Sequence, residues 1–229
     1  MKLLLFDIDG TLVRVRHDVL AGVLRSICRD VLGDAGHADN MELHGKTDRL
    51  IMLELCSRAG ITGSDAARLC SRMERALLEQ WEMHLDAETV ELLPGVRELV
   101  ERLAERPGIC LALLTGNLEP AARMKLAPHD LNGFFPFGAY GSDAVNRNDL
   151  PPIALERAHA HAAHRFTYQA TVIIGDSHRD IGCARAWGIR SLAVATGSLT
   201  EEELLGHEPD VVWPSLADTE RIVEWIEQG

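Results

Sequence analysis

Three short apolar runs of one design constrain the fold more than any other feature of this chain. Each run is rich in strand-forming residues and stops abruptly at small or acidic ones; the runs are Leu3 to Asp9, Cys110 to Asn117 and Thr171 to Asp176. Continuous apolar runs of this length are typical of central strands in a parallel sheet that is covered on both faces. The chain is therefore expected to form an α/β sheet with polar side chains at its strand ends.

Further strand and helix patterns support the same fold class. Additional strands are expected at Phe137 to Tyr140, Ser191 to Ala195 and Asp210 to Trp213, and helices at Gly95 to Glu105, Pro151 to Ala163 and Arg179 to Trp187. Strands that alternate with helices in this way predict a doubly wound fold around a parallel sheet.

A long insertion separates the first strand from the second. The gap is roughly a hundred residues, several times what a crossover connection needs. Apolar residues recur there at helical spacing, and helices are expected at Asp18 to Leu32, Thr47 to Ala59 and Ser64 to His84. We therefore predict an α/β core domain from residues 1–13 and 91–229 and a small, all-helical cap domain from residues 14–90.

Charge and composition exclude several classes of protein. The formal net charge is -12 and the chain has no run of Lys and Arg, so no nucleic-acid partner is expected. Asp7 and Asp9 interrupt the apolar start too early for a signal peptide, and no apolar stretch has membrane-spanning length. The five cysteines are scattered without a C-x-x-C pair, which indicates reduced thiols. We expect a cytoplasmic protein without a membrane partner, either a monomer or a homodimer.

Two acidic pairs carry the main functional signal. Asp7 and Asp9 follow the first strand, and Asp176 and Asp180 follow a later one. Open α/β sheets bind ligands at the carboxyl ends of their strands, so these carboxylates are expected to meet in one cleft. Converging carboxylates repel each other unless a hard cation lies among them, and Mg²⁺ prefers such oxygen ligands. A structural alternative is that each Asp only caps the helix that follows its strand.

With these motifs the sequence resembles the haloacid dehalogenase superfamily. The motifs are Asp7-Ile8-Asp9-Gly10-Thr11, Thr115-Gly116-Asn117, and Gly175-Asp176 with Asp180. The resemblance implies a Mg²⁺-dependent phosphatase for a small phosphorylated substrate. In that family the first Asp, here Asp7, forms an aspartyl-phosphate, and the second, here Asp9, acts as general acid and then as general base. The implied Mg²⁺ ligands are Asp7, the backbone carbonyl of Asp9, Asp176, and Asp180 directly or through water.

The phosphate itself needs further partners. By the resemblance, the hydroxyl and N–H of Thr115 and the N–H of Gly116 should hold phosphate oxygens, with Asn117 also in the substrate site. The family usually supplies a Lys before its last motif, whereas this chain has Arg147 at the matching place. We predict that Arg147 takes this role, because a guanidinium stays cationic and binds phosphate through two N–H groups. Lys125 is the alternative.

The insertion contains a second family-like segment, Gly45-Lys46-Thr47-Asp48-Arg49. It is similar to a loop of phosphoglycolate-phosphatase-like and β-phosphoglucomutase-like members that have a helical cap. By resemblance, Lys46 and Arg49 are predicted to bind an anionic group on the leaving portion of the substrate. A helix start, with Thr47 as N-cap and Asp48 in the first turn, explains the same residues.

Several functions remain open. Asp9 disfavours dehalogenation and phosphonate cleavage, because family members with those activities lack an Asp at this position. A phosphomutase of the β-phosphoglucomutase type is an alternative, although residues 13–16 do not match the pattern of such mutases. A non-catalytic ligand-binding member is a further, minor alternative. The substrate can be phosphoglycolate, a sugar phosphate, a nucleoside monophosphate or pyridoxal phosphate, and the sequence does not choose among them.

Overall fold

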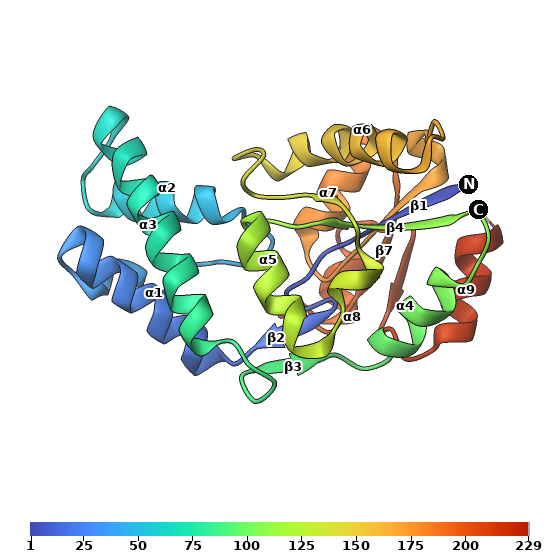
Figure 1. The fold of residues 1–229 in the computed structure, drawn as a ribbon, viewed down its shortest axis with the longest axis horizontal. Helices are drawn as coiled ribbons and strands as arrows, with labels where there is room; N and C mark the ends of the chain where they lie inside the picture. The colour runs from blue at the N-terminus through green and yellow to red at the C-terminus, as the bar shows by residue number, and fades with distance from the viewer. Residues whose placement is uncertain (229) are drawn as a thin grey trace.

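A six-stranded parallel sheet forms the centre of the protein (Figure 1). The computed structural model describes residues 1–228. In spatial order the strands are β5 (Gly138–Ala139), β4 (Ile109–Leu114), β1 (Lys2–Phe6), β6 (Thr171–Gly175), β7 (Arg190–Val194) and β8 (Val211–Trp213). All neighbouring strands in this sheet run parallel. The predicted α/β class with a parallel sheet is confirmed.

Helices cover both faces of the sheet (Figure 1). One face carries α6 (Leu150–Ala162) and α7 (His178–Trp187), and the other carries α4 (Val96–Ala104), α5 (Glu119–Leu126) and α9 (Thr219–Gln228). In β1, Leu3 and Leu5 pack toward α6 and α7, whereas Leu4 and Phe6 pack toward the opposite layer. Successive residues of a strand face opposite sides, so a strand between two layers must be apolar throughout. A short helix, α8 (Glu201–Leu205), lies between β7 and β8.

The strand order places β1 at the point where the direction of winding reverses. The chain continues from β1 to β4 and β5 on one side, and from β6 to β7 and β8 on the other. Phe6 lies opposite Leu113 of β4 and Ile174 of β6. The loops after these three strands therefore leave the same edge of the sheet side by side, where open α/β sheets bind their ligands.

The inserted segment forms three helices beside the sheet: α1 (His17–Leu32), α2 (Asp48–Arg58) and α3 (Gly63–His84). All three were predicted, and they lie at one end of the molecule, next to α5 (Figure 1). Their buried residues, such as Ile27, Met52 and Met73, form one apolar cluster that continues onto the α4 and α5 layer. Among the helices of residues 1–228, none is long and apolar enough to cross a membrane.

An antiparallel strand pair joins the insertion to the core. β2 (Val13–Val15) pairs with β3 (Val90–Leu92). We expected no strand within residues 14–90, and the predicted boundaries at residues 13 and 90 fall within this pair. Strands of three residues are too short to show an alternating pattern, so only their pairing in space reveals them. The division into core and cap domains stays a prediction.

Candidate active site

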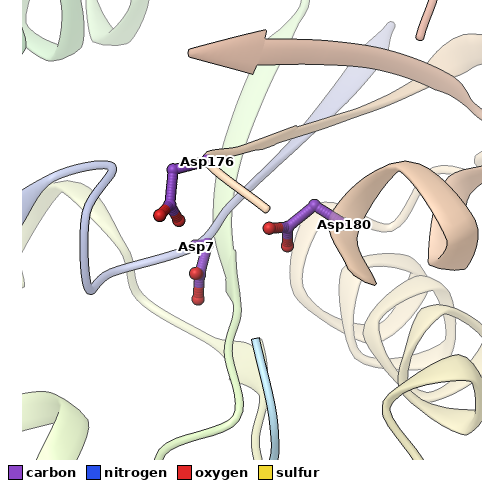
Figure 2. Close-up of side chains that lie close together, drawn as sticks. All are labelled: Asp7, Asp176 and Asp180. Atoms are coloured by element: carbon purple, nitrogen blue, oxygen red, sulfur yellow. The ribbon is translucent and has the colours of Figure 1, made fainter. Parts of the chain in front are cut away.

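Three carboxylates meet at the edge of the sheet where β1 and β6 end (Figure 2). Asp7 follows β1, Asp176 follows β6, and Asp180 lies in the first turn of α7. One oxygen of each carboxylate lies within 4.8 Å of the other two. Asp7 and Asp176 are 4% exposed and Asp180 is 2% exposed. Three of the four predicted acidic side chains thus share one buried space.

The start of α7 fixes Asp180 in this cluster. Ser177 is the N-cap of α7 and forms a capping box with Asp180. Oδ2 of Asp180 accepts from the N–H of Ser177 at 3.1 Å and from its hydroxyl at 2.6 Å. The other oxygen, Oδ1, faces the cluster and accepts a hydrogen bond from Nη2 of Arg147 at 2.6 Å. Asp180 therefore takes part in capping its helix, with Ser177 as the N-cap, and also belongs to the cluster.

Two glycines leave room for the carboxylate of Asp176. A Cβ atom at Gly10 would lie 2.4 Å from Oδ2 of Asp176, and one at Gly197 would lie 1.7 Å from it. Gly10 also has a φ of 83°, which side chains rarely adopt. The hydroxyl of Thr11 donates to Oδ1 of Asp176 at 3.4 Å. The sequence motif included Gly10, but nothing in the sequence marked Gly197, which follows β7.

Arg147 lies between two of the three carboxylates. Its Nη2 is 2.6 Å from Oδ1 of Asp180 and 3.1 Å from Oδ1 of Asp7. The same nitrogen donates to the carbonyl of Leu114 at 3.0 Å. Within residues 1–228 the buried Nε of Arg147 has no hydrogen-bond partner. Burial alone would lower the pKa of Arg147, but Asp180 and Asp7 raise it, so the guanidinium stays charged.

The cluster carries more negative than positive charge. Burial raises the pKa of Asp7 to about 6, although Arg147 opposes this rise. The pKa of Asp176 is also raised, first by burial and then by Asp7 and Asp180. The cluster has three carboxylates, and Arg147 contacts two of them. Buried carboxylate oxygens are the ligands that hard divalent cations prefer. The residues at this edge therefore fit a divalent metal ion.

A dependence of stability on pH follows from these raised pKa values. Between about pH 4, where a free Asp ionises, and about pH 6 the folded state binds more protons at Asp7 than the unfolded state does. The free energy of unfolding of the metal-free protein should therefore fall as the pH rises through this range.

A cation bound to the ionised cluster should reverse this loss. We expect Mg²⁺ to raise the melting temperature in EDTA-treated protein more at about pH 7.5 than at about pH 5. Thermal unfolding at both pH values measures this, with Asp176→Asn as the variant expected to respond less. Equal shifts at both pH values would contradict a metal site at the cluster.

Asp9 belongs to a separate network beside the cluster. Its side chain is 43% exposed. Its oxygens accept from Nζ of Lys125 at 2.8 and 2.7 Å, and Oδ2 also accepts from Nδ2 of Asn117 at 2.7 Å. Lys125 donates in turn to Oδ1 of Asn117 at 2.6 Å. The structure thus brings Asn117 to Asp9, and it places the second acid nearer to solvent than Asp7.

The position of Lys125 was not predicted. The sequence suggested Lys125 only as an alternative to Arg147, whereas the structure places the two cations at different carboxylates. Leu118, Ala121, Ala122 and Lys125 recur at helical spacing and are all buried. A lysine on the apolar face of a helix needs a charged or polar partner. This spacing is the signal that would have revealed it.

The loop after β4 differs from the prediction at Thr115. The N–H of Thr115 donates to the carbonyl of Ala139 at 3.0 Å, because pairing with β5 extends one residue beyond β4. The predicted phosphate contact from this N–H is therefore wrong. The hydroxyl of Thr115 accepts from Nδ2 of Asn117 at 2.8 Å. Within residues 1–228 the N–H of Gly116 has no hydrogen-bond acceptor, so it can still meet a phosphate oxygen.

The insertion contacts this same loop through its own backbone. The N–H of Asp48 donates to the carbonyl of Gly116 at 2.8 Å, and Oδ2 of Asp48 accepts from the N–H of Leu118 at 2.8 Å. A Cβ atom at Gly116 would lie 2.0 Å from the carbonyl oxygen of Lys46, so only glycine permits this approach. Burial raises the pKa of Asp48 to about 6, although Lys125 opposes this. Asp48 was expected within the family-like segment or in the first turn of a helix, and its contact with Leu118 was not predicted.

The two predicted cations of the insertion bind glutamates. Nζ of Lys46 lies 2.7 Å from Oε2 of Glu54, and Nε of Arg49 lies 2.8 Å from Oε1 of Glu74. Thr47 is the N-cap of α2, so the helix-start interpretation of this segment is confirmed. Substrate contacts of Lys46 and Arg49 stay a prediction.

Comparisons with known proteins agree with the motifs. A family model described as haloacid dehalogenase-like hydrolase matches residues 4–194. The chain is 28% identical to a phosphoglycolate phosphatase of Synechococcus elongatus, over 92% of this chain and 91% of that protein. It is 25% identical to pyrophosphatase PpaX of Halalkalibacterium halodurans, over 96% of this chain and 95% of that protein.

Solved structures show the same fold. A haloacid dehalogenase-like hydrolase from Bacteroides fragilis superimposes with a TM-score of 0.69 at 21% identity, over 95% of this chain and 98% of that chain. The family model begins within the first strand and includes the insertion and all residues of the carboxylate cluster. The chain therefore belongs to the haloacid dehalogenase-like hydrolase family, as its motifs predicted.

Proposed function

We propose that this protein is a Mg²⁺-dependent phosphatase that hydrolyses a small phosphorylated metabolite through an aspartyl-phosphate at Asp7. The observation that carries the proposal is the buried cluster of Asp7, Asp176 and Asp180 with Arg147 at its edge. Family membership supports a hydrolase, and the matched phosphoglycolate phosphatase and pyrophosphatase support phosphoryl chemistry.

The metal ligands proposed are the carboxylates of Asp7, Asp176 and Asp180 and the backbone carbonyl of Asp9. The raised pKa values of Asp7 and Asp176 show that burial disfavours their ionised forms, which a cation would stabilise. A bound divalent cation supplies positive charge that stabilises the oxygens of the transferring phosphoryl group. Because Gly10 and Gly197 have no side chains, the carboxylate of Asp176 has the space that it needs as a proposed metal ligand.

In the first displacement, an oxygen of Asp7 attacks the phosphorus and the bond to the leaving oxygen breaks. Arg147 fixes the orientation of Asp7 through their contact at 3.1 Å. Asp9 donates a proton to the leaving oxygen, so the product departs as a neutral alcohol. The side chain of Asp7 is 6% exposed and that of Asp9 is 43% exposed, so the acid is open to the leaving group while the nucleophile is shielded.

The second displacement restores the enzyme. Water attacks the phosphorus, Asp9 accepts a proton from that water, and the bond between phosphorus and Asp7 breaks. Inorganic phosphate leaves and Asp7 is again a carboxylate. The N–H of Gly116, which has no hydrogen-bond acceptor within residues 1–228, is proposed to bind a phosphate oxygen in both steps.

The substrate is tested with a panel. We expect phosphate release from at least one of phosphoglycolate, sugar phosphates, nucleoside monophosphates, pyridoxal phosphate, pyrophosphate and an aryl phosphate. Lys46 and Arg49 are paired with glutamates, so an anionic leaving group must compete with Glu54 and Glu74 for them. The member with the highest kcat/KM identifies the substrate class.

The metal requirement is tested on the same panel. EDTA is expected to stop phosphate release and excess Mg²⁺ to restore it, because the ionised cluster needs a cation. Release that EDTA does not change would contradict the metal-dependent mechanism. A folded protein that transfers phosphate between positions of a sugar phosphate, and releases none, would instead be a phosphomutase.

A further inference from the structure

Lys125 is a second buried cation at the site, distinct from Arg147. It lies on α5 and is 5% exposed. Its ammonium contacts both oxygens of Asp9, at 2.8 and 2.7 Å, and Oδ1 of Asn117 at 2.6 Å. An ammonium has three N–H groups, and these three contacts use all of them. Lys125 therefore acts on its neighbours Asp9 and Asn117, and has no N–H left for a substrate.

The partner of Lys125 in this network is itself fixed. Nδ2 of Asn117 donates to Oδ2 of Asp9 at 2.7 Å and to the hydroxyl of Thr115 at 2.8 Å. Asp9 is thus held from two sides, by an ammonium and by an amide. A half-exposed carboxylate without such partners would sample several rotamers. Charge-assisted hydrogen bonds restrict it to one.

A helix of the insertion packs against Lys125. Its Nζ lies 5.4 Å from the centroid of the Trp81 ring, which belongs to α3. Trp81 is 2% exposed, so this cation–π contact lies away from water, where such contacts are strongest. Lys125 is held between a carboxylate of the sheet edge and an aromatic ring of the insertion.

We propose that Lys125 is a positioning residue that fixes the carboxylate of Asp9 for proton transfer, and that Trp81 holds Lys125 in place. This rests on the proposed function, because it requires that Asp9 protonates the leaving group. It differs from the role of Arg147, which contacts Asp7 and Asp180 and not Asp9.

The leaving group of the substrate separates this role from others. An alkyl phosphate needs protonation of its leaving oxygen, whereas p-nitrophenolate leaves without it. We expect Lys125→Met to lower kcat/KM on the order of 10²-fold for the best alkyl phosphate of the panel and less than about tenfold for p-nitrophenyl phosphate. The ratio kcat/KM is used because it reports the steps up to release of the first product.

Two further variants complete the experiment. Arg123 is a cation on the same helix, and it contacts Phe135 and Tyr140 and not Asp9. Arg123→Met should therefore change kcat/KM equally for the two substrates. Trp81→Leu keeps an apolar side chain over Lys125 and removes the ring, and should show the same selective loss to a smaller degree. If melting curves show that Lys125→Met does not fold, Trp81→Leu provides the test of the positioning role.

The outcomes distinguish the two proposals. Equal losses on both substrates for Lys125→Met, or for Trp81→Leu where the first variant is unfolded, would overturn the positioning role and leave the phosphatase intact. Wild-type protein that hydrolyses neither substrate would overturn the proposed function and the role of Lys125 with it. A selective loss on the alkyl phosphate alone supports both.

Discussion

Replacing Asp7 with Asn is expected to lower kcat by roughly 10⁴- to 10⁶-fold while the protein stays folded. An amide of the same shape cannot form the aspartyl-phosphate, so the first displacement stops. Stability of the metal-free protein at neutral pH should not fall, because the variant removes one of three buried carboxylates and burial raises the pKa of Asp7 to about 6. Arg147 keeps its contact with Asp180. Phosphate release and thermal unfolding measure the two effects.

A matched control and a direct trap complete this test. Asp65→Asn changes an exposed carboxylate on α3 that pairs with Arg68 at the surface, and it should leave kcat unchanged. Acid quenching during turnover should trap labelled phosphate on wild-type protein and on Asp65→Asn, and not on Asp7→Asn. Trapped phosphate on Asp7→Asn would mean that another residue is the nucleophile.

Arg147→Met is expected to cause the largest loss of stability of any single substitution at the site. Removing one partner of a buried ion pair costs about 3–5 kcal/mol, because Asp7 and Asp180 would remain buried without their cation. Mg²⁺ should restore more of the free energy of unfolding in this variant than in wild type, since it replaces the missing charge. We also expect kcat to fall on the order of 10²- to 10³-fold because Asp7 loses its orienting partner. Urea unfolding with and without Mg²⁺ measures the stability.

Two other substitutions serve as controls for the loss of stability expected in Arg147→Met. Arg157→Met breaks an ion pair with Asp143 in which the arginine is 38% exposed, so it should cost less stability than the loss of the buried cation Arg147. Arg147→Lys supplies the residue type that the family usually has here, and its three N–H groups can replace the contacts to Asp7, Asp180 and Leu114. It should keep most of the stability. An Arg147→Met variant as stable as Arg157→Met would contradict the charge balance of the cluster.

The sheet could be predicted from the sequence because its strands are apolar throughout. The strand predicted in the apolar run that starts at Leu3 and stops at the acidic residues is observed as β1, Lys2–Phe6. The apolar run gives the strand, but the acidic residues after Phe6 turn out of the sheet toward the site. The β2 and β3 pair was missed, since neither three-residue strand has a pattern of its own.

The acidic cluster could also be predicted, because strand order alone brings Asp7 and Asp176 to one edge. The hydrogen-bond partners of the site residues could not be predicted. Whether the N–H of Thr115 is free depends on how far β5 extends beside it. Likewise, Lys125 becomes part of the site only because α5 turns its buried face toward Asp9. Such contacts depend on packing in three dimensions, which the motifs do not specify.

The pairing of β2 with β3 suggests where protein engineering should join a foreign segment in place of the insertion. Val15 lies opposite Val90, so the two ends of the segment between them are neighbours in space. A helical segment from a relative, joined at this pair, would enter and leave the sheet at the same place without changing the strand order. If the insertion binds the leaving group as predicted for Lys46 and Arg49, such a chimaera should take its leaving-group preference from the donor, provided that the donor supplies an aromatic ring over Lys125 where Trp81 lies now.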